Sequence, residues 1–152
     1  MTQKLYEADS YVQKFTAHVL RCTPAKDGYA VVLDRTAFFP EGGGQPYDTG
    51  SLGGARVVAV HTDGVTITHT TDAPLAEGSE VTGCIDWPAR LDAMQQHTGE
   101  HILSGTLHRL FGAENVGFHI GSEAVRMDTS VPISAEGLQA AELAANRIVW
   151  QD

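Results

Sequence analysis

The chain has 152 residues, which is enough for one ordinary domain or two very small ones. Its hydrophobic content of 42% and charged content of 19% are typical of a globular protein, and no run of about 18 apolar residues predicts a membrane span. The formal net charge of −9 argues against a non-specific nucleic-acid binder, because neutralising phosphates requires clustered Lys and Arg.

The amino-terminal stretch MTQKLYEADSYVQK lacks the apolar segment of a secretory signal. Cys22 and Cys84 are too few and too far apart for a disulfide framework, which fits a reducing cytosol. They also form no Cys-x-x-Cys zinc ribbon. We therefore expect a cytoplasmic protein without disulfides.

The first half of the sequence predicts β-structure. Five short segments alternate in polarity or are rich in β-branched residues, and turns such as Asp27-Gly28 and Asp63-Gly64 separate them. The predicted strands are Lys14–Cys22, Tyr29–Leu33, Ala55–His61, Val65–Thr70 and Glu80–Asp86. This spacing predicts a small barrel or sandwich, and an irregular β-rich loop region is the alternative.

The second half has a different character. Following Trp87-Pro88, the segment Ala89–Phe111 predicts a long helix whose apolar residues cover much of its circumference, so we expect it to be largely buried. These apolar residues are Leu91, Met94, Ile102, Leu103, Leu107, Leu110 and Phe111. Two short strands, Val116–Ile120 and Ala124–Asp128, and a helix over Ala135–Trp150 complete the prediction.

The predicted fold class is α+β, with a β-barrel domain over residues 1–88 and an α+β unit over residues 89–152. The pattern of the last helix continues into Gln151 and Asp152 without a Gly, Pro or basic stop signal. We therefore expect the second unit to be truncated at its C-terminus.

The stretch QHTGEHILS sets His97 and His101 four residues apart in the predicted long helix. Residues i and i+4 share a helix face, so the two imidazoles are candidate ligands of one metal ion. Glu100 stands directly before His101, and we expect it on another face. The zinc-protease pattern His-Glu-x-x-His places its Glu beside the first His, so that class of enzyme is excluded by register.

Two further stretches are candidate site segments. FFPEGGGQPYDTG contains three consecutive glycines, which permit a close backbone approach to a ligand. It lacks the Gly-Lys-Ser/Thr of a phosphate-binding loop and no helix follows it, and a floppy surface hairpin is the alternative. His119, in the stretch NVGFHIG, is either an ordinary histidine or a further site residue.

Taken together, RTAFFPEGGGQPYDTG, DWPARLDAMQQHTGEHILSGTL and VGFHIG resemble the alanyl-tRNA editing proteins, free-standing relatives of the editing domain of alanyl-tRNA synthetase. The resemblance covers nearly the whole chain. It implies a small β-barrel followed by an α+β catalytic domain. It also implies hydrolysis of the ester in mischarged tRNA(Ala), chiefly seryl-tRNA(Ala).

The resemblance also assigns roles to residues. His97 and His101 correspond to zinc ligands of the family, so zinc is the implied cofactor and mischarged tRNA(Ala) the implied partner. The Gly-rich loop lies near the aminoacyl site, as does the strand that follows the helix. The substrate-binding residues implied in this way are Gly43, Gly44, Gln45, Gly117 and His119.

The sequence departs from the family pattern in two places. The family completes its zinc site with a later Cys-x-x-x-His, and we expect those ligands beyond Asp152; this chain should therefore bind zinc poorly and be weakly active at best. Some members carry a hydroxyl residue near the position of Gly117, which glycine cannot replace in sensing a serine side chain.

Three hypotheses remain open from the sequence. The first is a trans-editing hydrolase, which the three motifs favour. The second is a non-catalytic tRNA-binding relative, and the third is a metal-dependent hydrolase of another small ester or amide. The acidic charge counts for the second and third.

Overall fold

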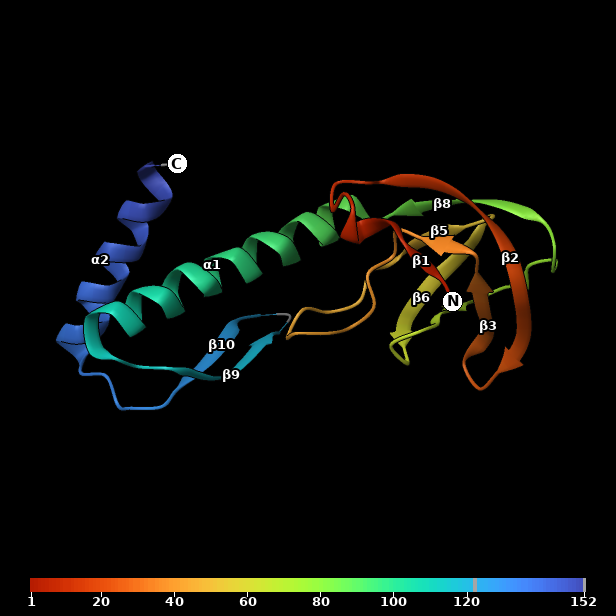
Figure 1. Cartoon of the computed structure of the whole chain (residues 1–152). Helices are drawn as coiled ribbons and strands as arrows, with labels where there is room; N and C mark the ends of the chain where they lie inside the picture. Colours follow the sequence, from red (N-terminus) through yellow and green to blue (C-terminus); the bar gives the residue numbers. More distant parts are fainter. Residues whose placement is uncertain (122, 152) are drawn as a thin grey trace. The chain divides into compact units, whose positions relative to one another are not determined.

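The computed structural model describes residues 1–121 and 123–151. The chain divides into two compact units, Met1–Leu91 and Asp92–Asp152, whose elements are shown in Figure 1. The predicted boundary after residue 88 lies three residues before this division. Among the described residues, no helix is long and apolar enough to cross a membrane.

In the part of unit 1 that the structure describes, six strands form a closed barrel in the order β2-β3-β7-β6-β5-β8, and β8 pairs with β2. Each pair of neighbours is antiparallel. The strands are β2 (Lys14–Ala25), β3 (Gly28–Leu33), β5 (Gly50–Leu52), β6 (Ala55–Thr62), β7 (Ile67–Thr71) and β8 (Glu80–Ile85). The predicted α+β class with an N-terminal β-barrel is confirmed.

Five of the barrel strands correspond to predicted ones, and the sixth, β5, was missed. It has three residues and lies between β6 and β8, so it closes the barrel. A three-residue strand beginning with Gly50 carries too little periodicity to be recognised from sequence. Three shorter elements were also not predicted: β1 (Gln3–Lys4) and β4 (Arg35–Thr36), which form a parallel pair, and the 3₁₀ helix η1 (Leu5–Glu7).

The barrel core is built by the inward-facing residues of each strand. On β2, Phe15, Ala17 and Val19 are buried while the residues between them are exposed, as a period of two requires. Phe38 is fully buried and packs edge-on against Phe15. Phe38 therefore anchors the start of the glycine-rich segment to the barrel core.

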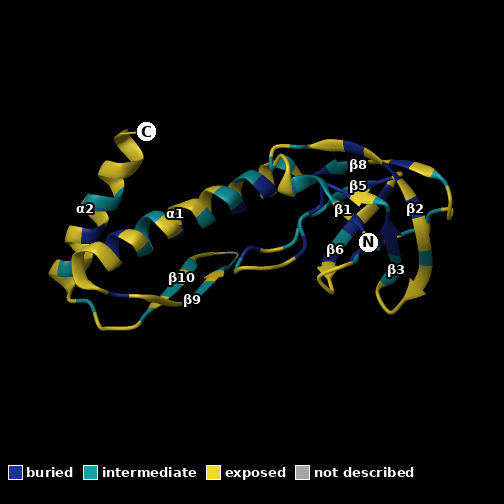
Figure 2. Cartoon of the chain, viewed as in Figure 1, coloured by how far each residue is buried: buried dark blue, intermediate teal, exposed yellow. Residues whose placement is uncertain are grey.

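Unit 2 contains most of α1 (Trp87–Phe111), the antiparallel hairpin of β9 (Asn115–Ile120) and β10 (Val125–Thr129), and α2 (Ala135–Gln151). Its buried cluster is small and consists of Leu107, Ala113 and Ala141. The hairpin follows one side of α1, and α2 is exposed over most of its length (Figures 1 and 2).

The expected deep burial of α1 is wrong. Of its seven apolar side chains named above, all of which the structure describes, Leu107 alone is buried, and Leu110 and Phe111 are 39% and 40% exposed. The reason is the small number of apolar partners: in the described part of unit 2 the buried cluster consists of Leu107, Ala113 and Ala141.

Candidate functional site

His97 and His101 lie on α1 with their rings side by side. The ring centroids are 5.0 Å apart and the planes are inclined by 18°. This follows from the i, i+4 spacing, which places both side chains on one face of the helix. The predicted closeness of the two imidazoles on one helix is confirmed, whereas their role as metal ligands stays a prediction.

Glu100 belongs to the same cluster, and the expectation that it points to another face is wrong. Ligand atoms of His97, Glu100 and His101 all lie within 4.8 Å of one another, and Glu100 Oε2 is 3.5 Å from Nδ1 of His101. Glu100 stands three residues after His97, about 60° away around the helix, so it borders the histidine stripe. The i, i+3 spacing of His97 and Glu100 was the sequence feature that could have predicted that Glu100 lies beside the two histidines.

The donor set of this cluster fits zinc. Zinc binds imidazole nitrogen, which His97 and His101 supply, and a carboxylate beside a histidine ligand is the usual partner of its second ring nitrogen. One side of the cluster is open, because the side chain of His101 is 71% exposed, while that of Glu100 is 3% exposed. The three residues therefore suit a metal ion that approaches from solvent.

Strand β9 lies beside the histidines through Phe118, whose ring centroid is 5.5 Å from that of His97. Gly117 and His119 flank Phe118 on the same strand. At Gly117, an added Cβ would meet Asp128 Oδ2 at 3.0 Å, so there is little space for a larger side chain at this position. Glycine also has no hydroxyl.

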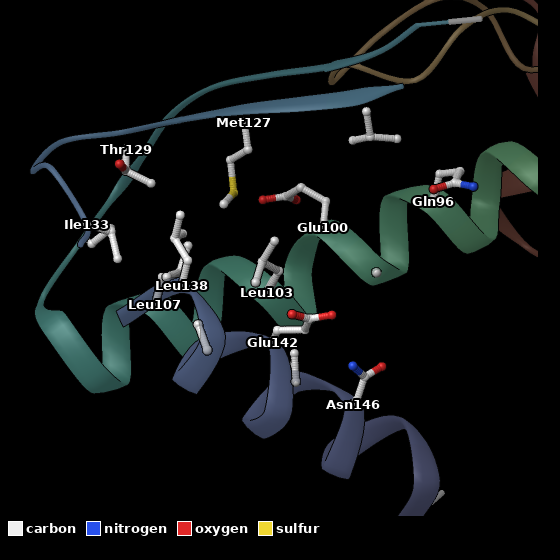
Figure 3. A pocket seen from close by; sticks show the side chains of 14 residues that line it. Gln96, Glu100, Leu103, Leu107, Met127, Thr129, Ile133, Leu138, Glu142 and Asn146 are labelled. Carbon is white, nitrogen blue, oxygen red and sulfur yellow. The ribbon is translucent and has the colours of Figure 1, made fainter. Parts of the chain in front are cut away.

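A pocket of about 700 Å³ adjoins the cluster within unit 2, between α1, β10 and α2 (Figure 3). Figure 3 shows Glu100 rising from α1 beside Met127, with Glu142 and Asn146 contributed by α2. Its apolar lining residues are Leu103, Leu107, Val125, Met127, Ile133, Leu138, Ala141 and Ala145. This size and mixture of apolar walls and few polar groups are typical of small-molecule sites, which measure about 300–1,000 Å³.

The glycine-rich segment of unit 1 is a tight turn rather than a floppy hairpin. Gly42 and Gln45 exchange backbone hydrogen bonds of 3.1 and 3.0 Å, and Gly43 and Gly44 have φ values of 60° and 80°. Positive φ at both central residues defines a type I′ turn, which glycine adopts without strain. Gln45 is 7% exposed, so the turn is held at its end by a buried side chain.

A buried ion pair holds the base of this segment. Arg90, in the first turn of α1, donates to both carboxylate oxygens of Asp48 and to the carbonyl oxygen of Ala37. Asp48 also accepts a 2.6 Å hydrogen bond from the Phe39 amide. The two charged residues are 3% and 5% exposed. Sequence reasoning missed this pair, because Arg on a helix is normally a solvated residue.

The glycine turn belongs to unit 1 and the histidine cluster to unit 2. The prediction that residues 42–45 lean toward His97 and His101 therefore stays a prediction. The same holds for the substrate-binding roles of Gly43, Gly44, Gln45, Gly117 and His119.

Comparison with known proteins shows which family this sequence belongs to. A family model described as "tRNA synthetases class II (A)" matches residues 7–89. The chain is 42% identical to the alanine–tRNA ligase of Pyrococcus abyssi over 99% of its own length and 17% of the ligase. It is 35% identical to the alanyl-tRNA editing protein Aarsd1 of Mus musculus, over 94% of its own length and 38% of that protein. The Danio rerio Aarsd1 protein is 34% identical, over 92% and 37% respectively.

The matched region extends across both units in these relatives, since it covers 92–99% of the chain, whereas the family model ends in the first turn of α1. The chain spans less than two fifths of the length of each relative. The barrel, the glycine turn and the histidine helix are thus one shared sequence unit. The chain belongs to the alanyl-tRNA editing protein family, which is related to the alanine–tRNA ligases.

Proposed function

We propose that this protein deacylates mischarged tRNA(Ala), chiefly seryl-tRNA(Ala), through a zinc site held by His97 and His101. The observation that carries the proposal is the cluster of His97, Glu100 and His101 in a chain that aligns over 94% of its length with a protein named for alanyl-tRNA editing. Membership of the family supports editing as the general activity, and the cluster supports a metal-assisted hydrolysis.

The residues of the chain have distinct tasks in this reaction. His97 and His101 hold the ion by neutral ring nitrogens, and Phe118 packs against the ring of His97. A zinc ion held there would supply Lewis-acid polarisation of the ester carbonyl and an activated water. Hydrolysis adds water across the ester bond, so that the amino acid leaves as a free carboxylate and the terminal ribose hydroxyl of the tRNA is restored.

The preference for serine follows from the limits of size selection. A synthetic site shaped for alanine only weakly rejects a side chain with one added hydroxyl, so a second, hydrolytic site must remove the error. Gly43, Gly44 and Gln45 are proposed to contact the aminoacyl end, with Gly117 and His119 as further contacts. Gly117 cannot supply a hydroxyl, so another group must recognise the serine side chain.

The net charge of −9 favours a second candidate function, a metal-dependent hydrolase of a small ester or amide that carries no phosphate chain. The two functions are separated by comparing seryl-tRNA(Ala), alanyl-tRNA(Ala) and serine methyl ester as substrates. We expect faster release of serine from the tRNA than alanine from its cognate tRNA, and no acceleration of methyl ester hydrolysis. Hydrolysis of the methyl ester with no effect on either tRNA would establish the second function instead.

A further inference from the structure

Glu100 is a buried carboxylate with two identified neighbours. Its Oε1 accepts a 2.6 Å hydrogen bond from the side-chain amide of Asn115, and its Oε2 lies 3.5 Å from Nδ1 of His101. A carboxylate removed from water is costly unless polar partners compensate it. The side chain is therefore fixed by its contacts and not by solvent.

Asn115 extends this contact to strand β9. Its Oδ1 accepts a 3.0 Å hydrogen bond from the backbone amide of Gly117, while its amide group donates to Glu100. A backbone N–H can only donate and a carboxylate can only accept, so the orientation of the Asn115 side chain is determined. Hydrogen bonds thus connect Glu100 through Asn115 to Gly117, and Nδ1 of His101 lies 3.5 Å from the same carboxylate.

We infer that Glu100 is a positioning residue, which fixes the tautomer and the ring orientation of His101 and connects it to the strand that carries Gly117. A carboxylate can only accept, so a hydrogen bond formed across the 3.5 Å between Oε2 and Nδ1 places the proton of the neutral imidazole on Nδ1 and leaves the lone pair of Nε2 for a metal ion. Histidine ligands of metals commonly donate their second ring N–H to a carboxylate in this way. The inference deepens the proposed function, because it rests on His101 being a metal ligand.

A second histidine–carboxylate pair in the same unit provides a matched control. His108 Nδ1 lies 3.0 Å from Glu114 Oε1, and the two side chains are 62% and 66% exposed. Exposed pairs of this kind contribute little, because water competes for both partners. Glu114→Gln should therefore leave the tautomer of His101 and the zinc affinity unchanged, whereas Glu100→Gln should alter both.

The first test reads the tautomer in the native protein and uses a substitution only to assign its signals. In protein labelled with ¹⁵N-histidine, at a pH where the imidazoles are neutral, the His101 ring resonances are assigned by their loss in His101→Ala. We expect the Nδ1-protonated tautomer for His101. Observation of the Nε2-protonated tautomer in the native protein overturns the inference.

The second test compares variants by zinc affinity, measured in competition with a chromogenic chelator. Glu100→Gln keeps an acceptor for Asn115 but presents an N–H donor to His101, so it reverses the tautomer and should weaken zinc binding by about 10–100-fold. Glu114→Gln should retain native affinity. Native zinc affinity in folded Glu100→Gln protein contradicts the inference.

The third test follows the Asn115 contact. Asn115→Ala removes the acceptor for the Gly117 amide, so we expect faster hydrogen exchange at Gly117 than in the native protein. Unchanged exchange contradicts a connection between Glu100 and the strand. Should Glu100→Gln fail to fold, the native tautomer and this exchange rate decide the inference by themselves. None of the three measurements involves tRNA, so the absence of deacylation would refute the proposed function and leave the role of Glu100 intact.

Discussion

At the scale of single residues, His69 shows how the barrel accommodates a polar side chain. It is fully buried, its Nδ1 donates to the Val31 carbonyl oxygen at 3.1 Å, and Thr36 Oγ1 donates to its Nε2 at 2.8 Å. Thr36 Oγ1 in turn accepts from the amide of Phe38. The neutral imidazole is thereby satisfied at both nitrogens, and the network holds the start of the glycine-rich segment.

His69 should make the stability of the protein depend on pH. Burial lowers the pKa of His69 from 6.5 to about 4. Between pH 6.5 and about pH 4, the unfolded chain therefore binds a proton at His69 that the folded protein does not bind. The contribution of His69 to the free energy of unfolding is complete above pH 6.5 and is lost as the pH falls toward 4. The difference between the two pKa values corresponds to about 3 kcal/mol in the free energy of unfolding.

The measurement is urea unfolding at several pH values between 7.5 and 4.5. His69→Asn should be less stable than the native protein at pH 7.5 but should show a shallower decline toward pH 4.5. His61→Asn, which alters an exposed histidine of the same barrel, should reproduce the native slope. An equally steep decline in His69→Asn would show that other groups cause the pH dependence.

Gln45 is the one residue of positions 42–45 that carries a side chain. It is buried at the end of the type I′ turn, and its amide is proposed to recognise the aminoacyl end. Gln45→Ala should slow deacylation of seryl-tRNA(Ala) with the far-ultraviolet circular dichroism preserved. Unchanged deacylation kinetics would remove the turn from the proposed site.

At the scale of elements, the ion pair of Asp48 and Arg90 joins the segment after the glycine turn to the first turn of α1. Removing one partner leaves a buried charge without compensation, which typically costs about 3–5 kcal/mol. Asp48→Asn should lower the free energy of unfolding by about this amount. Glu7→Gln, which breaks the exposed pair with Lys4, should cost under about 1 kcal/mol. Similar small losses of stability in Asp48→Asn and Glu7→Gln would show that hydrogen bonds to backbone carbonyl oxygens are enough to compensate the buried charge of Arg90.

Helix α1 carries two glycines that its stability does not require. An added Cβ at Gly99 or Gly105 would meet nothing within 4 Å. Glycine in a helix interior is less favourable than alanine by about 1 kcal/mol, so Gly105→Ala should raise the free energy of unfolding by about that amount. Gly105 does not line the pocket beside Glu100, so zinc affinity should stay native. A destabilised Gly105→Ala protein would show that another part of the protein packs against α1 at Gly105.

These elements also show what the sequence reveals and what it conceals. Strands with regular alternation, such as β2, and the i, i+4 histidines follow directly from local periodicity. Strand β5, the Asp48–Arg90 pair and the burial of Glu100 depend on contacts between residues distant in sequence, which periodicity does not encode. Asp48 and Arg90, for example, are 42 positions apart.

At the scale of the whole molecule, the barrel and the histidine cluster belong to separate compact units of one shared sequence region. The editing activity is our proposal, and the cluster of His97, Glu100 and His101 is its proposed chemical basis. The central claim is therefore that the same cluster binds zinc and supports deacylation, and a substitution that removes zinc must also remove the activity.

The most direct measurement is the initial rate of seryl-tRNA(Ala) deacylation by chelator-treated protein as zinc is added back. The native chain should show a slow rate that rises with zinc to a plateau above spontaneous hydrolysis. His97→Ala should stay at the spontaneous rate, and His108→Ala, an exposed histidine farther along the same helix, should behave like the native chain. Deacylation that is independent of zinc and equal in His97→Ala and native protein would contradict the account.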